Sequence, residues 1–434
     1  MRGSMSRREF VGLTAAAGLA AGAPAWARGA NEKIIVGVMG VSRAYGAPAR
    51  PGRGTGLAMG LARIPGAEVA YVCDVDRAYL DAAVADVAQV QGRPPQGVTD
   101  FRRILDDKAV DALVIATPDH WHAPAAILAL GAGKHVYVEK PCSHNAREGE
   151  LLVEAARKHR RVVQHGTQRR SWPSHIEAVA ALRQGAIGRV LYARCFYLFS
   201  DRPSIGRGKA VPPPETLDWS LWQGPAPERP FRDNYVHYNW HWFWHWGTAE
   251  LGNNGVHTLD VCRWGLGVDY PVLAACVGSR LRYDDDQETP DASIATFQFE
   301  NGTTITWEQR SWGGRSPADP SYQVAFFGDR GTLTISGSSW SIYDKSGVEV
   351  AKGSSPAGDE THLRNFLDSI RGEARPNAEI EEGHKSTLLC HLGNISWRTG
   401  RMIRFDPKAR KIVGDREAEA YWSREYRPGW EPRV

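Results

Sequence analysis

The chain of 434 residues lacks the features that mark several large classes of protein. None of its six cysteines stands in a Cys-x-x-Cys pair, and most lie in apolar stretches. We therefore expect buried free thiols, and neither a metal site nor redox chemistry. The net charge is only +4 and no stripe of basic residues occurs, so nucleic acid and anionic membrane surfaces are poor partners. Internal repeats and low-complexity segments are also missing, which leaves the composition of an ordinary enzyme.

The first 30 residues have the pattern of a targeting segment rather than of a folded element. Residues 1–4 resemble an expression tag, and residues 6–11, Ser-Arg-Arg-Glu-Phe-Val, form a twin-arginine motif. A mild apolar stretch follows at residues 13–23, too short and too rich in glycine and alanine to span a bilayer. Ala-Trp-Ala at residues 25–27 fits a cleavage site. We expect twin-arginine export to the periplasm, with no stable membrane anchor after cleavage; an amphipathic N-terminal arm is the alternative.

Residues 111–141 predict a strand, a helix and a second strand. The apolar run at residues 112–116 is typical of a strand buried on both faces, and Pro118 ends it. A helix is expected at residues 123–132 and another buried strand at residues 135–138. Lys140 follows that strand directly. Because ligands bind at the carboxyl edge of open parallel sheets, this lysine is a candidate functional residue.

These residues resemble the Gfo/Idh/MocA family of sugar and polyol oxidoreductases. The family signature is a Thr-Pro-x-x-x-His turn followed by Glu-Lys-Pro at the end of a Rossmann sheet. The resemblance extends from about residue 33 to about residue 401 and implies a bound nicotinamide cofactor. The signature residues, which the resemblance places at that cofactor, are Thr117, Pro118, His122, Glu139, Lys140 and Pro141.

Glycines near the start of the first domain predict a site for the cofactor pyrophosphate. A strand at residues 33–40 contains Gly37 and Gly40, and a helix resumes at Gly54 and Gly56. Glycine lets the backbone turn tightly and approach a phosphate at a helix N-terminus. The insertion between them, residues 41–53, departs from the usual fingerprint. It is either a lid over the phosphates, to which Arg43 would contribute, or a longer surface loop.

A second strand, residues 68–74, ends in a carboxylate, Asp74. An acid at this place accepts hydrogen bonds from the adenosine ribose and repels a 2′-phosphate, which favours NAD over NADP. Arg77 lies close and leaves NADP open. The alternative is that Asp74 caps the next helix, a role that Asp76 could also fill.

The second half of the chain predicts an α/β domain with an open, largely antiparallel sheet. In family members such a sheet often makes an oligomer contact, so we expect a homo-oligomer. The whole chain is then divided into the targeting segment 1–30, a Rossmann domain 31–164, a substrate-binding α/β domain 165–360, and C-terminal helices with a tail at 361–434. The predicted strands of the sheet are residues 189–199, 272–277, 292–299, 303–309, 322–328 and 331–335.

Tryptophan, tyrosine and histidine are concentrated in residues 217–246. Rigid aromatic rings with polar edges suit the apolar faces and polar rims of sugars. An aromatic-packed structural loop is the alternative. A metal site at His237, His241 and His245 is not favoured, because no cysteine or carboxylate stands at ligand spacing. The predicted substrate-binding residues are Gln168, Arg169, Tyr235, Tyr238, Trp240, Trp244 and Asn254.

The run Gly-Asn-Asn-Gly-Val-His, residues 252–257, resembles the second catalytic block of the family, with Asn253 in place of the usual aspartate. In dehydrogenase members the histidine, here His257, removes the hydroxyl proton while Lys140 orients the hydroxyl and stabilises the alkoxide. We expect an ordinary pKa for His257, near ~6.5, which suits a base at neutral pH. Asn253 can still orient the histidine by a hydrogen bond.

Export constrains the reaction, because no pool of nicotinamide regenerates a spent cofactor outside the cytoplasm. We therefore predict an oxidoreductase acting on a sugar, polyol or glycoside, with tightly bound NAD restored in each cycle. The first alternative is an NAD-dependent glycoside hydrolase that works by transient oxidation, elimination and water addition. The second is a non-catalytic NAD-binding scaffold or sensor, against which the retention of Lys140 and His257 argues.

Overall fold

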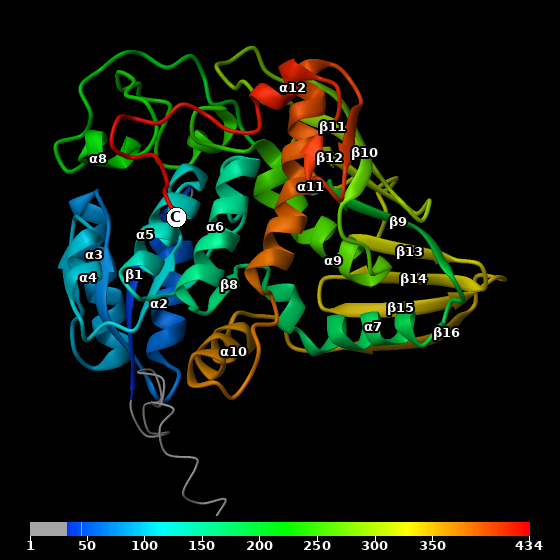
Figure 1. The fold of residues 1–434 in the computed structure, drawn as a ribbon, viewed down its shortest axis with the longest axis horizontal. Helices are drawn as coiled ribbons and strands as arrows, with labels where there is room; N and C mark the ends of the chain where they lie inside the picture. The colour runs from blue at the N-terminus through cyan, green and yellow to red at the C-terminus, as the bar shows by residue number, and fades with distance from the viewer. Residues whose placement is uncertain (1–32, 45, 199) are drawn as a thin grey trace, which may run out of the picture.

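The computed structural model describes residues 33–434 except residues 45 and 199, and it shows two domains side by side (Figure 1). The twin-arginine motif and the expected cleavage site lie outside the described residues. No helix in the described part of the chain is long and apolar enough to cross a membrane.

The first domain is a six-stranded parallel sheet with the strand order β5-β4-β1-β6-β7-β8. This is the order of dinucleotide-binding folds, whose crevice lies where the strand order reverses, at the carboxyl ends of the strands. The predicted Rossmann fold is therefore confirmed. Its strands are β1 (Ile34–Met39), β4 (Ala67–Cys73), β5 (Gln96–Val98), β6 (Ala112–Ile115), β7 (His135–Val138) and β8 (Val163–His165). Its helices are α2 (Arg53–Ala62), α3 (Arg77–Gln91), α4 (Arg102–Asp106), α5 (Asp119–Gly131) and α6 (Ala146–His159).

The second domain is built on a ten-stranded sheet with the order β16-β15-β14-β13-β9-β12-β11-β10-β17-β18. Its pairs are antiparallel except β9 with β12, so the predicted open, mostly antiparallel sheet is confirmed. The strands are β9 (Val190–Tyr197), β10 (Pro271–Ser279), β11 (Ala292–Phe299), β12 (Thr304–Arg310), β13 (Val324–Gly328), β14 (Gly331–Ser336), β15 (Ser339–Asp344), β16 (Glu349–Ser354), β17 (Ile403–Asp406) and β18 (Lys411–Ile412).

Helices cover one face of this sheet and join it to the first domain. The core beneath the sheet includes side chains of α7 (Pro173–Arg183), α9 (Val256–Leu266) and α11 (Ile380–Thr399). Helices α9 and α11 lie between the two domains (Figure 1). All six cysteines are buried free thiols, as predicted.

The C-terminal segment, residues 361–434, contributes to both domains. Helix α10 (Glu360–Arg371) packs its apolar side into the core of the first domain. Strands β17 and β18 extend the large sheet, although the sequence suggested only helices and a tail there. These strands are too short for their alternation to be recognised in the sequence. A short helix, α12 (Arg416–Ala420), follows them.

A long connection with little regular structure runs from β9 to α9. Its middle part, residues 216–246, is called the aromatic segment below. It contains α8 (Trp219–Gln223) and the 3₁₀ helix η2 (Asn239–Trp242). It has a small core of its own, formed by Leu217, Trp222, Ala226, Phe231, Tyr235, Trp240, Phe243 and Trp246.

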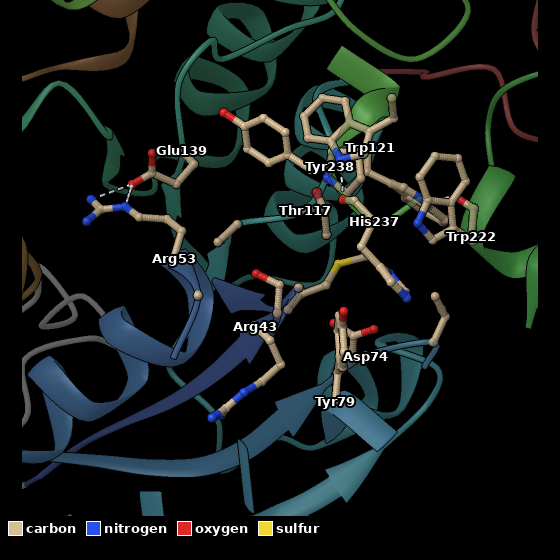
Figure 2. Close-up of a pocket in the computed structure, with 18 of the residues that line it drawn as sticks. Arg43, Arg53, Asp74, Tyr79, Thr117, Trp121, Glu139, Trp222, His237 and Tyr238 are labelled. Carbon is tan, nitrogen blue, oxygen red and sulfur yellow. Dashed lines mark hydrogen bonds and ion pairs between the residues drawn. The ribbon is translucent and has the colours of Figure 1, made fainter. Parts of the chain in front are cut away.

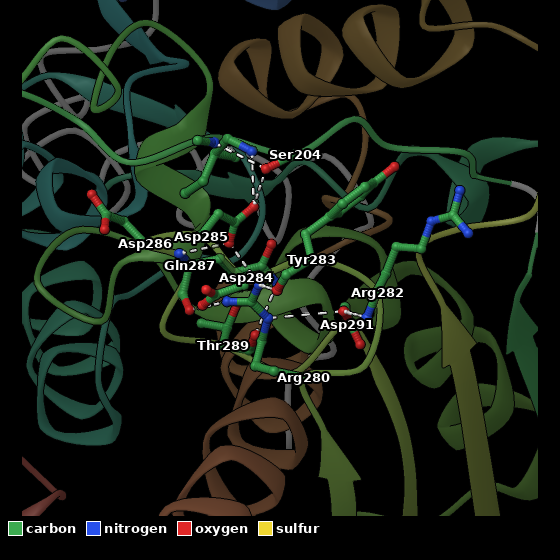
Figure 3. A network of polar contacts seen from close by, with 12 residues as sticks. Ser204, Arg280, Arg282, Tyr283, Asp284, Asp285, Asp286, Gln287, Thr289 and Asp291 are labelled. Carbon is green, nitrogen blue, oxygen red and sulfur yellow. Dashed lines mark hydrogen bonds and ion pairs between the residues drawn. The ribbon is translucent and has the colours of Figure 1, made fainter.

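A polar network fixes the start of this connection to the second domain (Figure 3). Asp285 accepts hydrogen bonds from Ser204 Oγ at 2.7 Å and from the guanidinium of Arg280 at 2.6 Å. Asp286 accepts from the backbone N–H of Gly208 at 2.8 Å and from Asn234 at 3.0 Å. The carboxylates of this loop are thus used as acceptors for backbone and side-chain donors.

One buried ion pair holds the entry to the second domain against α9. Arg170, in the 3₁₀ helix η1 (Gln168–Ser171), donates two bonds to Asp260, with Nε to Oδ2 at 2.8 Å and Nη2 to Oδ1 at 2.9 Å. Ser386 of α11 donates to the same carboxylate at 2.6 Å. The pair therefore ties three elements together beside the domain boundary.

We predict that Asp260→Ala lowers the free energy of unfolding by about 3–5 kcal/mol, because the buried guanidinium of Arg170 loses its hydrogen-bonded carboxylate and keeps only Glu382 at 3.7 Å. Urea unfolding of the purified variant would measure this change. Glu360→Ala, which removes an exposed pair with Arg364, should change stability by less than about 1 kcal/mol. Equal effects of the two substitutions would contradict the assignment.

Candidate active site

A cavity of about 690 Å³ lies at the carboxyl edge of the parallel sheet, between the two domains (Figure 2). Four strands of the sheet each contribute a residue just past their carboxyl end. These are Gly40 after β1, Asp74 after β4, Thr117 after β6 and Lys140 after β7. The opposite wall comes from the second domain and includes Leu221, Trp222, His237, Tyr238, Trp240, His241 and Asn253.

Two of the predicted glycines line the cavity. Gly40 has φ +89°, and a Cβ on it would come within 2.6 Å of the backbone at Ala116 and Thr117. Gly56, in the first turn of α2, also lines the cavity and is open there. Gly37 and Gly54 instead allow close packing, against Ile104 and against the carbonyl of Gly40. The backbone at Gly40 and the start of α2 thus suits a pyrophosphate.

The insertion forms a hairpin of β2 (Arg43–Ala44) and β3 (Ala47–Pro51) on one wall of the cavity. Two arginines of the insertion, Arg43 and Arg53, pair with carboxylates, whereas the lid interpretation placed Arg43 at the phosphates. Arg43 pairs with Asp86 and donates to the carbonyl of Ala49 at 2.7 Å. Tyr45 of this insertion lies outside the described residues.

Glu139 is the buried partner of Arg53, as Figure 2 shows. The guanidinium reaches a Glu139 oxygen at 2.7 Å and Asp359 at 2.6 Å. Burial disfavours the charged form of Glu139, but Arg53 and Lys140 outweigh it and lower the carboxyl pKa. This charged group therefore supports the wall beside Lys140.

Asp74 lies where the ribose of a dinucleotide is expected. Asp76, and not Asp74, caps α3, since its carboxylate accepts from the N–H of Ala78 at 3.0 Å. Asp74 accepts from the N–H of Asp76 at 3.0 Å and lines the cavity. Burial raises the pKa of Asp74 to about 7. Asp76 therefore caps the helix, and the alternative role proposed for Asp74 does not apply.

Lys140 contacts the second domain across the cleft. Its Nζ donates to the Asn253 carbonyl at 2.7 Å and to Asn253 Oδ1 at 3.2 Å. Burial lowers the pKa of this lysine. His122 joins the two signature turns, with its ring nitrogens 2.8 Å from the Thr117 carbonyl and 2.5 Å from the Pro141 carbonyl. The signature residues therefore hold one another in place, and Thr117, Pro118 and His122 also line the cavity.

His257, which the sequence predicts as the proton acceptor, lies at the start of α9, is half-buried, and is near enough to Lys140 for that charge to act on it. Among the described residues, those that line the cavity do not include it, and its Nδ1 is buried without a hydrogen-bond partner. Burial and then the charge of Lys140 lower its pKa well below the usual range. The expectation of an ordinary pKa is wrong, because the fold surrounds much of the ring and brings Lys140 near it.

The predicted substrate-binding residues separate into two groups. Tyr238 and Trp240 line the cavity. The others do not: Tyr235 lies in the core of the aromatic segment, Trp244 packs against Arg398, Asn254 donates to Glu250, and Gln168 and Arg169 lie in η1.

Several residues of the cavity wall were not predicted as site residues. They include Trp121, Trp222, His237 and His241. The histidines had been weighed only as metal ligands. In the described structure the rings of these histidines contact separate partners. The ring of His237 lies against the carboxylate of Asp76, and the rings of His241 and His245 lie against the backbone carbonyls of Tyr238 and Pro227. The unusual density of aromatic residues was the available signal.

The fold and the site define a two-domain NAD-binding oxidoreductase. The parallel sheet has the strand order of dinucleotide-binding folds, with a glycine turn at a helix start. An acid stands at the ribose position, and a lysine stands at the same carboxyl edge of the sheet. The family model for "Oxidoreductase family, NAD-binding Rossmann fold" matches residues 34–167. The model for "Oxidoreductase family, C-terminal alpha/beta domain" matches residues 205–432. The chain belongs to the Gfo/Idh/MocA oxidoreductase family.

Relatives differ in what their names say they act on. Inositol 2-dehydrogenase 2 of Saccharopolyspora erythraea is 30% identical over 250 residues, which is 56% of this chain and 59% of that protein. A glycosyl hydrolase family 109 protein of Shewanella sp. (strain W3-18-1) is 29% identical over 140 residues, 31% of this chain and 30% of that protein. The matches thus span less than two thirds of these relatives.

Solved structures share the fold over nearly the whole described chain. Levoglucosan dehydrogenase, solved with NADH and levoglucosan, has a TM-score of 0.66 at 18% identity. The match covers 86% of this chain and 99% of that one.

We predict that NAD binds more tightly as pH rises through about 7, the pKa to which burial raises Asp74. Ribose hydroxyls donate to the carboxylate form, so binding at lower pH must release a proton, and affinity falls about tenfold per pH unit below that pKa. Titration of nucleotide-free protein with NADH, followed by fluorescence, would measure this. Asp74→Asn should bind weakly at every pH, and a variant that kept the wild-type pH dependence would contradict the assignment.

Proposed function

We propose that this protein oxidises a hydroxyl group of a sugar or polyol and retains its NAD between the two halves of the reaction. The observation that supports this most directly is the way the aromatic segment covers the cofactor cleft. Bound NAD supplies the hydride acceptor. The residues of the chain bind it, enclose it and position the hydroxyl.

The aromatic segment joins the first domain by backbone hydrogen bonds next to the ribose position. The N–H of Arg77 donates to the Thr216 carbonyl at 3.0 Å, and the N–H of Asp218 donates to the Val75 carbonyl at 3.0 Å. His237 reaches Asp76 at 3.1 Å above Asp74, as Figure 2 shows for the ring. A dinucleotide in the cleft could leave only after these contacts break.

Further contacts hold the same segment on the other side of the cleft. Trp121 of α5 donates from its indole to the Trp222 carbonyl at 2.9 Å. The C-terminal tail lies over this point, because the N–H of Arg427 donates to the Pro225 carbonyl at 3.0 Å and Trp430 packs edge-on against Trp121. A cover held by the backbone at several points suits a cofactor that stays bound.

Lys140 is the group best placed to act on the substrate oxygen. Its ammonium lies at the cavity wall and its acceptors are both on the neutral residue Asn253. It therefore keeps its positive charge available for an oxygen that becomes negative as the hydroxyl is oxidised. Tyr238 and Trp240 provide aromatic surface beside it for a sugar ring.

Export by the twin-arginine route to the periplasm is part of the proposal, and it rests on the motif at residues 6–11. Restoring NAD within each cycle would be necessary there. A homo-oligomer through the open sheet is also proposed. It is supported by Val277 and Ile294, which face each other on β10 and β11 and are 69% and 49% exposed.

An NAD-dependent glycoside hydrolase is the second candidate, supported by the relatives of glycosyl hydrolase family 109. It uses the same first step, since a transient ketone acidifies the neighbouring C–H and allows a β-substituent to leave. A non-catalytic NAD-binding scaffold would not need a half-buried lysine at the cavity.

We predict that the purified, unsupplemented protein carries close to one equivalent of NAD or NADH, which acid release and mass spectrometry would quantify. Mixing it with a sugar should reduce the bound cofactor once and yield a keto product. Release of aglycone from an aryl glycoside with no net NADH would favour the hydrolase. Lys140→Ala should keep the nucleotide and lose the reaction, whereas the scaffold hypothesis predicts no reaction in either protein.

We also predict that His237→Ala speeds NADH dissociation about tenfold or more, because a hydrogen bond to a charged group, worth about 1.5 kcal/mol, no longer closes the segment. Stopped-flow fluorescence against an NAD trap would measure the rate. His159→Ala, on α6 and away from the cavity, is the matched control. Unchanged dissociation from the His237 variant would argue against retention by the aromatic segment.

A further inference from the structure

One end of the cavity is walled by apolar side chains from both domains. In the strand order β5-β4-β1-β6-β7-β8, the glycine turn for the pyrophosphate follows β1, and Asp74 at the ribose position follows β4. A dinucleotide that runs from this turn past Asp74 therefore places its adenine toward β5 and its nicotinamide over β6 and β7. The part of the cavity toward β5, called the adenine end below, is lined by Val75, Thr99, Phe101, Trp121, Leu221 and Trp222.

Leu221 and Trp222 come from the second domain, and backbone hydrogen bonds hold their helix, α8, over the turn that follows β4. The N–H of Asp218 donates to the Val75 carbonyl at 3.0 Å. The carboxylate of the same Asp218 caps α8 by accepting from the N–H of Leu221 at 2.8 Å. Leu221 and Trp222 therefore lie within about one helical turn of the residue that is bonded to Val75.

The indole of Trp222 is fixed in this wall by its neighbours. Trp219 stacks on it, with ring centroids 4.8 Å apart and planes inclined by 19°. The rings of Trp246 and His120 meet it with centroids 5.3 and 5.2 Å away, and its backbone carbonyl accepts from the indole of Trp121 at 2.9 Å. Since the ring is already ordered, little side-chain entropy is lost when a planar base packs against it.

The first domain supplies the other side of the adenine end. Phe101, which follows β5, is 1% exposed and packs edge-on against Trp121, with ring centroids 5.6 Å apart. The residues of the adenine end carry no charge, whereas Arg53, Glu139 and Lys140 line another part of the cavity. An apolar slot of this kind suits an uncharged planar ring with polar edges, and adenine is the group of a dinucleotide that has this chemistry.

We propose that Leu221 and Trp222 close over the adenine base of NAD, so that the second domain anchors the cofactor by its adenosine half. The inference rests on the proposed retention of NAD between half-reactions, and it names where that retention arises. The nicotinamide changes its charge and ring geometry in each half-reaction, whereas the adenine stays the same. An anchor at the adenine end therefore holds NAD and NADH about equally.

The aromatic segment meets two ligands in this arrangement. Helix α8 packs on the base of the cofactor, while Tyr238 and Trp240 line the same cavity as Lys140. The rings that bind adenine are thus distinct from the rings proposed to contact a sugar. Substitutions at α8 should for this reason change cofactor affinity without changing which sugar is accepted.

Fragments of the cofactor test the assignment in nucleotide-free, full-length protein. ADP-ribose lacks the nicotinamide and nicotinamide mononucleotide lacks the adenosine, so calorimetric titration with each of them reports one half of the site. We expect ADP-ribose to bind within about tenfold of NAD, and the mononucleotide to bind at least about 100-fold more weakly than ADP-ribose. A mononucleotide that binds as well as ADP-ribose would overturn the proposal.

Leu221→Ser removes part of the proposed cover without touching the aromatic core of the segment. It should weaken ADP-ribose and NADH alike by about tenfold and leave the mononucleotide unchanged. Leu151→Ser is the matched control, because both leucines are half-buried against the same core of the first domain and Leu151 does not line the cavity. Unchanged ADP-ribose affinity in the Leu221 variant, or an equal loss in the Leu151 variant, would refute the assignment.

The holoenzyme gives an independent measurement. Release of bound NAD and of bound NADH into an excess of ADP-ribose should be accelerated to the same extent by Leu221→Ser. An acceleration of only one of the two forms would place the anchor at the nicotinamide and contradict the proposal. Neither measurement needs turnover, so a protein that oxidised no sugar would contradict the proposed function while the titrations still decided which half of the cofactor is held.

Discussion

The contact of Lys140 with Asn253 is the interaction on which the arrangement of the site depends. A half-buried ammonium needs hydrogen-bond acceptors, and both acceptors of this one come from the other domain. The hydrogen bonds of the Lys140 ammonium thus require the second domain. They also fix the spacing between the two walls of the cavity. An aspartate in place of Asn253 would neutralise the ammonium. The asparagine anchors it and leaves its charge to act on the substrate oxygen.

The aromatic segment forms the wall of the cavity opposite the parallel sheet. It belongs to the connection between β9 and α9, donates hydrogen bonds to Asp286 and Glu288 of the 284–291 loop, and also forms hydrogen bonds with the first domain on both sides of the cleft. Its own small core gives it the stiffness that a long connection would otherwise lack. Trp222, Trp240 and Trp246 belong to this core, and Trp222 and Trp240 also line the cavity. The two interpretations of the aromatic composition, structural packing and a surface for a ligand, thus apply to the same two tryptophans.

The sequence predicted the parallel sheet and the lysine at its edge because both depend on short, continuous stretches of the chain. Buried parallel strands appear as apolar runs, and a residue that directly follows such a run must lie at the ligand-binding edge. The same reasoning placed Asp74 correctly at the end of its strand. Short strands such as β17 and β18 carry too few residues for a period to show.

What the sequence could not give depends on contacts between distant parts of the chain. Arg53 belongs to the insertion that the lid interpretation places at the phosphates, but its partners Glu139 and Asp359 are far away in sequence. The lowered pKa of His257 likewise depends on distant parts of the chain, since the charges of Lys140 and Arg169 act on it from outside its own helix. No local pattern separates Trp240, which lines the cavity, from Trp244, which packs on Arg398.

Retention of the cofactor and the shape of the substrate side of the cavity are linked in this architecture, because one segment forms both. His237 reaches Asp76 beside the ribose position, and Tyr238 and Trp240 come next in the cavity wall. If the segment moved away to release the cofactor, these rings would move with it and the wall opposite the parallel sheet would be lost. A protein with an open cleft would then keep its glycine turn and Asp74 but not its aromatic surface. Such a coupling confines the proposed contact with a sugar to the state in which the nicotinamide is present and enclosed, where the hydride that leaves the substrate has an acceptor.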